Sequence, residues 1–403
     1  MSKSAGKAGW AVNKISDVAV VFDGPHATPK TIEAGPIFLG IGALQDGTIN
    51  LGEMRHVTAE DFQRWTRRVR PQANDVVFSY ETKLGEAAII PEGLDCCLGR
   101  RMGLVRLDEK RVVPRFFLYQ YISPLFRDFL SDRTIRGATV DRISIKEFPA
   151  FPITVPPLPE QQRIVGILDE AFDGIATAKA NAEKNLQNAR ALFESHLQEV
   201  FTRSGEGWVQ KRLSDICTEI TVGHVGLMAK QYKGSGIPFL RSQNIRPFRV
   251  TLENVVFIDE VFHSSLSKSQ LRPGDLAIVR TGYPGTAAVI PDTLKTSNCS
   301  DLVIVRPGNH VDPHYLAAFF NSSYGKGMVI GKLVGAAQRH FNVAAAKNVL
   351  IHLPPLTEQR GVVSAITASR LQTQRLESIY RQKLAALDSL KKSLLDQAFN
   401  GLL

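Results

Sequence analysis

The sequence predicts an α+β protein in which two pseudo-repeated α/β modules are joined by two long helices that form an antiparallel coiled coil. Three observations predict this fold. The second half of the chain repeats the first, each copy opens with short strand-like runs, and each copy closes with a long amphipathic stretch. The length of 403 residues exceeds the ~250–300 residues at which a single core stops growing, so two or more domains are expected.

The internal repeat runs along the whole chain at an offset close to 200 residues. Its strongest match pairs GEAAIIP at residues 85–91 with GTAAVIP at residues 285–291. Further matches keep the same order: 74–77 with 274–277, 104–106 with 304–306, 137–138 with 335–336, and 156–161 with 354–359. Matches that stay in register over this length indicate two copies of one structural unit.

Each copy begins with a globular stretch whose β-branched and aromatic runs are bounded by Gly, Pro, Asn or Asp, as strands commonly are. The predicted strands are residues 37–41, 76–80 and 87–90 in the first copy and 239–240, 276–280 and 287–290 in the second. A short helical segment follows, at residues 114–130 and 313–324. Each of these segments begins with proline, which suits the first turn of a helix.

Each copy ends in a long helix, so the chain divides into modules at residues 1–155 and 205–353 and helices at residues 156–204 and 354–403. Apolar residues recur along both helices at three- and four-residue steps. The positions expected to form the coiled coil are Ile164, Leu168, Ile175, Leu186, Phe193, Leu197, Ile366, Leu376, Tyr380, Leu384, Leu387 and Leu394. Some 40 helical residues make a rod about 60 Å long. Two stripes of matched length favour pairing with each other over separate packing of each helix on a globular core.

The composition favours an anionic partner. The formal net charge is +10 and the pI is near 9.4, which points first to nucleic acid and second to an anionic membrane surface. No apolar run approaches the ~20 residues that span a bilayer, and the first ten residues lack the apolar core of a secretory signal. The four cysteines form neither a disulfide framework nor a zinc pattern, so we expect a cytoplasmic protein with reduced thiols.

One motif occurs twice, each time at the head of a long helix. It reads VPPLPEQQR at residues 155–163 and LPPLTEQR at residues 353–360. A Leu/Val-Pro-Pro-Leu-x-Glu-Gln motif that follows two unlike globular units resembles the specificity subunits of type I restriction–modification enzymes, and the resemblance covers nearly the whole chain. The second copy lacks one glutamine, which leaves open the relative rotation of the two helices.

This resemblance implies that the chain recognises DNA without catalysing a reaction. Its two modules would be target recognition domains that each read one half of a split DNA sequence. The implied partners are double-stranded DNA, two methyltransferase subunits and restriction subunits, with no membrane. The chain would bind no cofactor of its own, because S-adenosylmethionine, ATP and Mg²⁺ belong to the partner subunits. Since direct readout needs different side chains for different base edges, two unlike modules imply two unlike half-sites.

Polar residues in the loops of both modules are candidates for contacts with bases or phosphates. Residues 241–246 (RSQNIR) carry the densest set, with arginine suited to guanine and Gln/Asn suited to adenine. The candidate DNA contacts are His26, Thr28, Lys30, Gln45, Lys83, Arg136, Thr139 and Arg142 in the first module, and Lys230, Gln231, Tyr232, Arg241, Gln243, Asn244, Arg246, Arg280, Tyr283, Gln338, Arg339 and His340 in the second. A solvated surface loop is the alternative for each of them.

Two other functions stay open. Asp75, Glu81 and Lys83 resemble the Asp…Glu-x-Lys arrangement of Mg²⁺-dependent nucleases, in which converging carboxylates hold the metal. The second copy keeps only the aspartate, Asp275, so a turn before a strand is the simpler role for Asp75 and Asp275. A coiled-coil adaptor without a DNA role is the third hypothesis. The sequence has no adenine-methyltransferase Asn/Asp-Pro-Pro-Tyr/Phe motif, phosphate-binding loop or His-Glu-x-x-His motif, and no metal site is expected.

Overall fold

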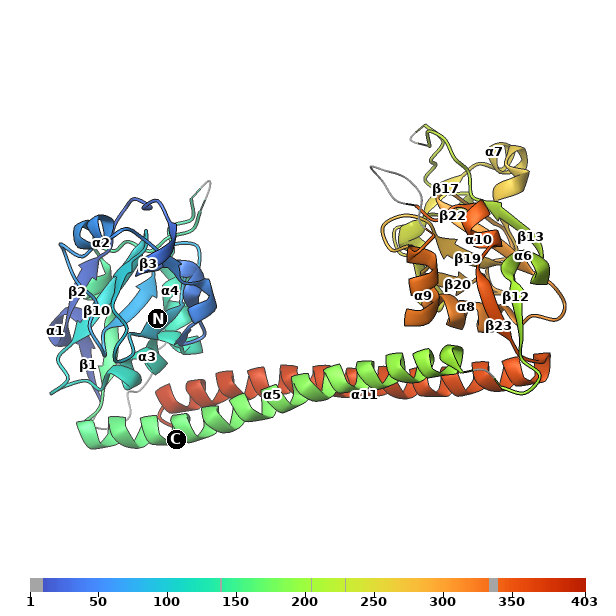
Figure 1. Ribbon diagram of the computed structural model, residues 1–403. Helices are drawn as coiled ribbons and strands as arrows, with labels where there is room; N and C mark the ends of the chain where they lie inside the picture. Colours follow the sequence, from blue (N-terminus) through green and yellow to red (C-terminus); the bar gives the residue numbers. More distant parts are fainter. Residues whose placement is uncertain (1–9, 138–139, 204, 229, 333–339) are drawn as a thin grey trace. The chain divides into compact units, whose positions relative to one another are not determined.

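The computed structural model describes residues 10–137, 140–203, 205–228, 230–332 and 340–403 (Figure 1). The chain forms two compact units: Met1–Ala182 with Gln382–Leu403, and Glu183–Arg381. Each unit therefore combines one globular module with part of helix α5 (Leu158–Thr202) and part of helix α11 (Leu356–Phe399).

The main sheets of the two modules have the same topology, as the internal repeat predicts. In the first module the strand order is β2 (Ala19–Asp23), β10 (Met102–Leu107), β7 (Val76–Ser79) and β8 (Ala87–Ile89), all antiparallel. In the second module the order is β13 (Cys217–Val222), β22 (Leu302–Pro307), β19 (Leu276–Val279) and β20 (Ala287–Val289), again antiparallel. The register repeats too, since Leu104 pairs with Val77 and Ile304 pairs with Ala277.

A second sheet in each module contains one parallel pair. It consists of β6 (Arg55–His56), β3 (Ile32–Leu39) and β9 (Cys96–Leu98) in the first module, and of β17 (Val256–Ile258), β14 (Ile237–Leu240), β21 (Ser297–Cys299) and β18 (Gln270–Leu271) in the second. Short hairpins follow, β4 (Leu44–Gln45) with β5 (Thr48–Ile49) and β15 (Ile245–Arg246) with β16 (Arg249–Val250).

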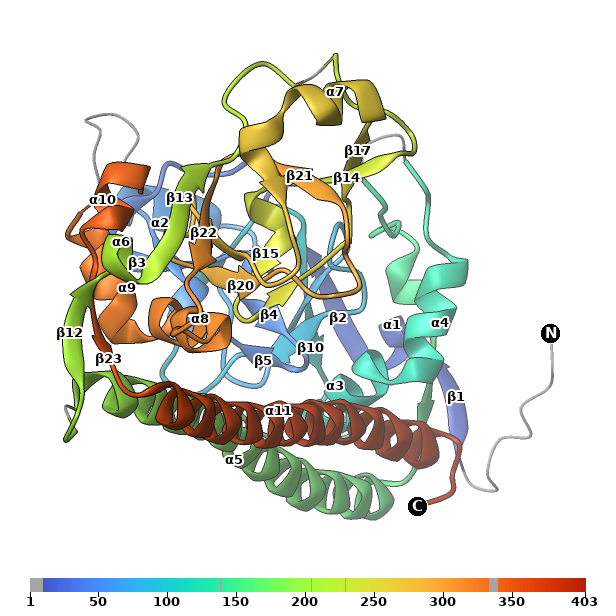
Figure 2. The ribbon, with the colours of Figure 1, turned by 90° about the vertical axis from the view of Figure 1, so that its right-hand side faces the viewer.

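A two-stranded ribbon closes each module just before its long helix. It pairs β1 (Ala11–Lys14) with β11 (Pro152–Val155), and β12 (Val209–Arg212) with β23 (Leu350–Leu353). Figure 2 shows β12 and β23 side by side, with β23 leading into α11. The remaining helices are α1 (Ile15–Val18), α2 (Ala59–Trp65), α3 (Pro114–Ile122) and α4 (Pro124–Asp132) in the first module, and α6 (Leu213–Ile216), α7 (Glu260–Ser265), α8 (Pro313–Asn321), α9 (Ser323–Ile330) and α10 (Val343–Lys347) in the second.

The helical segment predicted at residues 114–130 is two helices, α3 and α4, and its counterpart is likewise α8 and α9. Ser123 interrupts the first pair with an extended backbone, because the following Pro124 disfavours helical geometry at the residue before it. The Ser123 hydroxyl then accepts a hydrogen bond from the Phe126 amide at 3.3 Å and caps α4. Ser322 caps α9 in the same way, through the Gly325 amide at 3.0 Å.

The repeated Pro-Pro-Leu-x-Glu-Gln motif has a structural role in both copies. Gln161 is fully buried, accepts a hydrogen bond from the Val113 amide at 2.8 Å, and donates to the carbonyls of Arg111 at 2.9 Å and Pro156 at 2.8 Å. The fully buried Gln359 makes the same three bonds with the Asp312 amide and the carbonyls of His310 and Pro354. One side chain thus joins the head of each long helix to the start of α3 or α8.

The two long helices lie antiparallel within each unit. In the first unit Lys179 forms an ion pair with Asp388, and Arg163 donates a hydrogen bond to the Leu403 carbonyl at 2.9 Å. In the second unit the Arg190 Nε lies 2.8 Å from Glu377 Oε1. The α+β fold with repeated modules and paired long helices is confirmed.

The helix ends also join the cores of the modules. Ile164, Leu168, Leu395 and Phe399 belong to the core of the first module, and Leu197, Phe201 and Ile366 belong to that of the second. Of the other positions expected in the coiled coil, Ile175 is buried and Leu186, Phe193, Tyr380, Leu384, Leu387 and Leu394 are half-buried. Leu376 is 40% exposed, and its place in the coiled coil remains a prediction. Small residues such as Ala182 and Ala189 take the buried positions near the helix centre, where a straight helix drifts away from a strict heptad.

Candidate nucleic-acid interface

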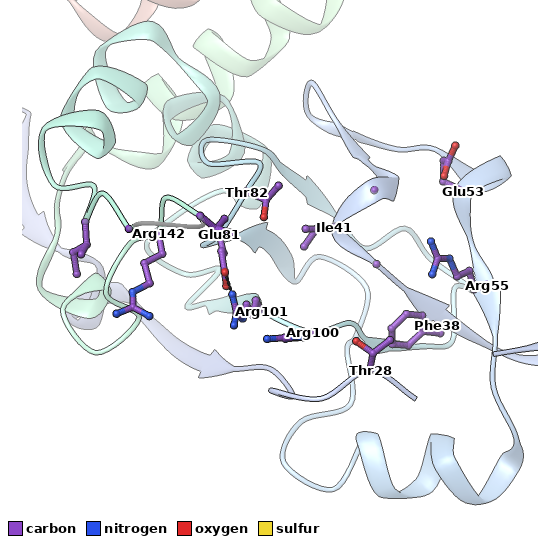
Figure 3. Close-up of a pocket in the computed structure, with 15 residues that line it drawn as sticks. Thr28, Phe38, Ile41, Glu53, Arg55, Glu81, Thr82, Arg100, Arg101 and Arg142 are labelled. Atoms are coloured by element: carbon purple, nitrogen blue, oxygen red, sulfur yellow. Dashed lines mark ion pairs between the residues drawn. The ribbon is translucent and has the colours of Figure 1, made fainter. Parts of the chain in front are cut away.

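A pocket of about 770 Å³ opens on the first module, and four arginines line it (Figure 3). Its walls come from segments far apart in the sequence: Thr28 follows β2, Phe38 to Gly42 span the end of β3 and the next turn, Arg55 begins β6, Glu81 follows β7, Arg100 and Arg101 join β9 to β10, and Arg142 follows α4. Polar side chains at strand ends are therefore brought together by the two sheets of the module.

Arg101 is held by the backbone of the turn between β9 and β10. Its φ of 63° lies in the left-handed region, and its amide donates to the Pro25 carbonyl at 3.1 Å. The Arg101 carbonyl accepts a hydrogen bond from the Tyr80 amide at 3.4 Å, which ties the turn to the end of β7. Its guanidinium pairs with the carboxylate of Glu81, which is buried. Because Glu81 neutralises it, Arg101 contributes shape more than net charge to the pocket.

Three further arginines supply the positive charge of the pocket. In the part of the chain that the structure describes, the side chains of Arg55, Arg100 and Arg142 are exposed and make no hydrogen bond or ion pair. Figure 3 shows the guanidinium groups of Arg142, Arg101 and Arg100 along one side of the pocket and Arg55 on the other. Unpaired guanidinium groups in a hollow suit phosphate oxygens and the guanine edge, both of which accept two parallel hydrogen bonds.

The second module builds the same backbone frame with different side chains. The amide of Arg280 donates to the Asp301 carbonyl at 3.4 Å, and Asp301 has a φ of 55°, so Asp301 stands where Arg101 stands in the first module. Its carboxylate accepts hydrogen bonds from the hydroxyls of Thr281 and, at 2.9 Å, Ser242. An Arg–Glu pair in one module is thus replaced by an aspartate with two hydroxyl donors in the other.

The candidates in the first module fall into three groups. Thr28 and Arg142 line the pocket. The His26 imidazole lies 2.8 Å from the Asp23 carboxylate, and Lys83 Nζ donates to the carbonyls of Gly42 at 3.1 Å and Leu44 at 3.4 Å, so both side chains support neighbouring loops. Three further candidates have exposed side chains and remain predictions: Lys30, Gln45 and Arg136. Thr139 lies outside the described residues.

The side chains of the loop with the densest set of candidates, residues 241–246, are largely satisfied by backbone carbonyls of residues 251–254. Asn244 is fully buried. Its side-chain Nδ2 donates to the carbonyls of Thr251 at 3.0 Å and Glu253 at 3.2 Å, and its Oδ1 accepts from the Arg241 backbone amide at 3.0 Å. Asn244 cannot reach a base, so its assignment was wrong. Short polar side chains often bond nearby backbone groups in turns, and the sequence does not distinguish this use from an exposed one. Arg241 and Gln243 also donate to the Asn254 carbonyl, at 2.9 Å and 3.3 Å.

The other candidates in the second module vary in exposure. Tyr283 is 80% exposed, and Lys230 and Arg246 are also exposed. Four candidates are half-buried: Gln231, Tyr232, Arg280 and His340. Gln338 and Arg339 lie outside the described residues. These residues remain predictions.

The nuclease hypothesis needs converging carboxylates, and the structure separates them. Asp75 precedes β7 and binds Arg106, with distances of 2.7 Å and 2.9 Å to its two oxygens, whereas Glu81 follows the other end of β7 and pairs with Arg101. No cluster of three or more potential metal-binding side chains occurs among the described residues. Asp75 and Asp275 do lie in turns before strands, as predicted: the Gln72 and Arg272 amides donate to their carboxylates at 2.8 Å and 2.9 Å.

Arg55, Arg100 and Arg101 were missed by sequence reasoning. The adjacent arginines at 100 and 101 lie between two strand-like runs, a pattern that indicates a turn with exposed polar side chains. Arg55 carried no such signal, because its place in the pocket depends on the pairing of β6 with β3.

Comparisons with known proteins agree with this geometry. A family model described as the type I restriction modification DNA specificity domain matches residues 7–187. The specificity subunit of the type I restriction enzyme EcoKI from Escherichia coli (strain K12) is 24% identical, and the alignment covers 99% of this chain and 90% of that protein. The StySPI specificity subunit from Salmonella potsdam is 22% identical, with 98% and 89% covered.

Solved structures share the fold. A chain from a structural study of complex assembly and conformational transition of the type I R-M system superposes with a TM-score of 0.80 at 20% identity, covering 98% of this chain and 99% of that one. The HsdS subunit from Thermoanaerobacter tengcongensis superposes with a TM-score of 0.61 at 21% identity, with 99% and 98% covered. No helix in the described ranges has both the length and the apolar character needed to cross a bilayer.

Proposed function

Because this chain belongs to the family of type I restriction–modification specificity subunits, which recognise DNA and are not catalytic, we propose that its two modules read the two unlike halves of a split DNA target. The observation that carries this proposal is the contrast between matched positions of the two modules. Arg101, Glu81 and Arg142 of the first module correspond to Asp301, Thr281 and His340 of the second, on one backbone frame.

The contrast has a direct meaning for base readout. Arginine pairs with the two acceptors of guanine, whereas a carboxylate accepts a hydrogen bond from the amino group of cytosine. In the first module the guanidinium of Arg142 makes no hydrogen bond or ion pair with any described residue and is available as a donor. In the second module the Asp301 carboxylate on the matching frame is already engaged by the hydroxyls of Thr281 and Ser242. Half or more of the contacts in such interfaces go to phosphate and sugar, so Arg55, Arg100 and Arg142 would supply affinity as well as sequence preference.

The long helices would serve as the spacer and as the docking surface for the partner subunits. We place two methyltransferase subunits and the restriction subunits in this role, and S-adenosylmethionine, ATP and Mg²⁺ would be bound by those subunits. Since an α-helix rises 1.5 Å per residue, seven residues added to each helix would lengthen the spacer by about 10 Å, near three base-pair steps.

The test is adenine-methylation mapping of DNA from cells that express this chain with its methyltransferase partner. We expect methylation of a split motif with two unlike halves. Exchange of residues 1–155 for those of another specificity subunit should change one half and leave the other half intact. A stable complex that adds no new methylation, or a target that changes in both halves, would contradict the proposal.

A further inference from the structure

The junction between α3 and α5 in the first unit is closed by a carboxylate. The Tyr119 hydroxyl donates to Asp169 Oδ1, and the Arg115 Nε lies 3.0 Å from the same oxygen. Arg115 also donates to the Tyr119 hydroxyl at 3.2 Å, and the Tyr119 ring meets Phe172 edge-on with the ring centres 5.2 Å apart. The charges and the ring thus fill the space between the module and its long helix.

The matching junction of the second unit lacks these groups. The Gln161 and Gln359 bonds set the register of the two copies, and in that register His314 replaces Arg115, Ala318 replaces Tyr119, Thr367 replaces Asp169 and Arg370 replaces Phe172. A pocket of about 240 Å³ remains there, lined by Phe248, His314, Ala318, Ile366, Thr367 and Arg370 among others. The missing phenol ring and carboxylate account for the empty space.

Arg370 faces this pocket, and it forms no ion pair with any residue that the structure describes. Its Nε is buried and makes no hydrogen bond with any described residue, although the guanidinium lies 4.9 Å from the centre of the Phe248 ring. Burial lowers the pKa of Arg370 because the charged form loses hydration. A buried N–H of a charged group that lacks an acceptor is unfavourable, so a carboxylate placed beside the Arg370 Nε would gain a charge-assisted hydrogen bond.

Phe248 is held over the pocket at a conformational cost. It stands where the first module has Gly47, and it keeps a left-handed φ of 64° against 89° for the glycine. A bulky residue adopts this region only when its surroundings determine its conformation. Here the Phe248 backbone amide donates a hydrogen bond to the Ala287 carbonyl at 3.0 Å, which holds the backbone in place. The Phe248 ring forms one wall of the pocket and is the cation–π partner of Arg370.

We propose that this pocket binds an aspartate or glutamate side chain of a partner polypeptide, which we take to be a methyltransferase subunit; the identity of the partner rests on the function proposed above. The size of the pocket favours a single side chain, because sites for small molecules typically measure about 300–1,000 Å³. Leu371, which is 58% exposed, lies one turn after Thr367 on the same helical face, so an apolar surface adjoins the charge. The second unit would receive from the partner the carboxylate that Asp169 supplies within the first.

The test compares two variants that differ only in charge. Thr367→Asp places a carboxylate within the chain, at the position of Asp169, and should satisfy Arg370 and exclude the partner. Thr367→Asn has nearly the same size and no charge. In titrations with the purified methyltransferase partner at constant salt, we expect Thr367→Asp and Arg370→Met to weaken assembly roughly ten- to a hundredfold, as loss of one charged hydrogen-bonded pair predicts, and Thr367→Asn to have little effect. Equal affinities for Thr367→Asp, Thr367→Asn and the natural chain would overturn the proposal.

A second measurement identifies the occupant. With the photo-crosslinker p-benzoylphenylalanine in place of Thr367, irradiation of the complex should link a methyltransferase peptide that has Asp or Glu beside the linked residue. A link to a segment without a carboxylate, or no link in the assembled complex, would also overturn the proposal. Methylation mapping distinguishes failure of the docking proposal from failure of the proposed function. If the Thr367→Asp complex assembles normally and still methylates a split target, only the docking proposal is refuted. If Thr367 is linked to an acidic peptide but the complex methylates no split target, only the proposed reading of DNA is refuted.

Discussion

Replacement of Gln161 by leucine tests whether the repeated motif holds each long helix to its module. The leucine fills a similar volume, so the change removes three hydrogen bonds without opening a large cavity. A hydrogen bond contributes about 1 kcal/mol on average, and the Val113 amide is left without a partner, so we expect the free energy of unfolding to fall by about 3 kcal/mol. For a unit of this size, that corresponds to a fall in Tm of roughly 6–12 °C.

The assay is thermal and urea unfolding followed by circular dichroism, with Gln162→Leu as the matched control. Gln162 is the next residue of the same helix and is exposed, so its replacement should change stability by less than about 0.5 kcal/mol. Gln359→Leu should reproduce the effect in the second unit, because Gln359 makes the same three bonds. A loss for Gln161→Leu within about 1 kcal/mol of the control would refute the reasoning, since it would mean that the bonds add nothing beyond those made with water.

Three further predictions concern the interface and the helix pair. The double variant Arg100→Ala with Arg142→Ala should lower the affinity for target DNA. The slope of log affinity against log salt concentration should become shallower by about 0.9 for each phosphate that the protein no longer neutralises. An unchanged slope in binding titrations from roughly 50 to 300 mM salt would argue against binding of phosphates by these arginines. Asn244→Ala should lower the free energy of unfolding by about 2 kcal/mol and leave the methylated sequence unchanged, so a changed sequence would restore Asn244 as a base-reading residue. In the folded state, hydrogen bonding to Arg190 lowers the pKa of Glu377 from its ordinary value of 4.5. The contribution of Glu377 to stability is therefore complete above pH 4.5 and is lost as the pH falls through the lowered pKa, so the stability difference between the natural chain and Glu377→Gln should shrink in acid. A stability difference that stays constant from about pH 7 to 3 would contradict this prediction.

Much of the architecture could be predicted because the signals are local or repeated. The 3.6-residue periodicity after each Pro-Pro-Leu-x-Glu-Gln motif predicted both long helices, and the paired GEAAIIP and GTAAVIP segments predicted that the two modules share one topology. The break of the short helical segment at Ser123 was missed although Pro124 marks it. The burial of Ala182 and Ala189 could not be predicted from apolar periodicity, because only the packing of the partner helix decides which face is covered near the helix centre.

The sequence by itself determined the repeat, the long helices, the basic charge and the unlike chemistry of the two modules, because each of these is a property of residue order or composition. The tertiary structure alone decided which polar side chains face outward. Asn244 is used by a backbone turn, Glu81 by Arg101, and Lys83 by two carbonyls, whereas the side chains of Arg55 and Arg100 bond to no described residue in the pocket. The physical reason is that a hydrogen-bonding group is available to DNA only if no group of the chain satisfies it first, and those competing groups are brought near by strand pairing and turns across long stretches of sequence.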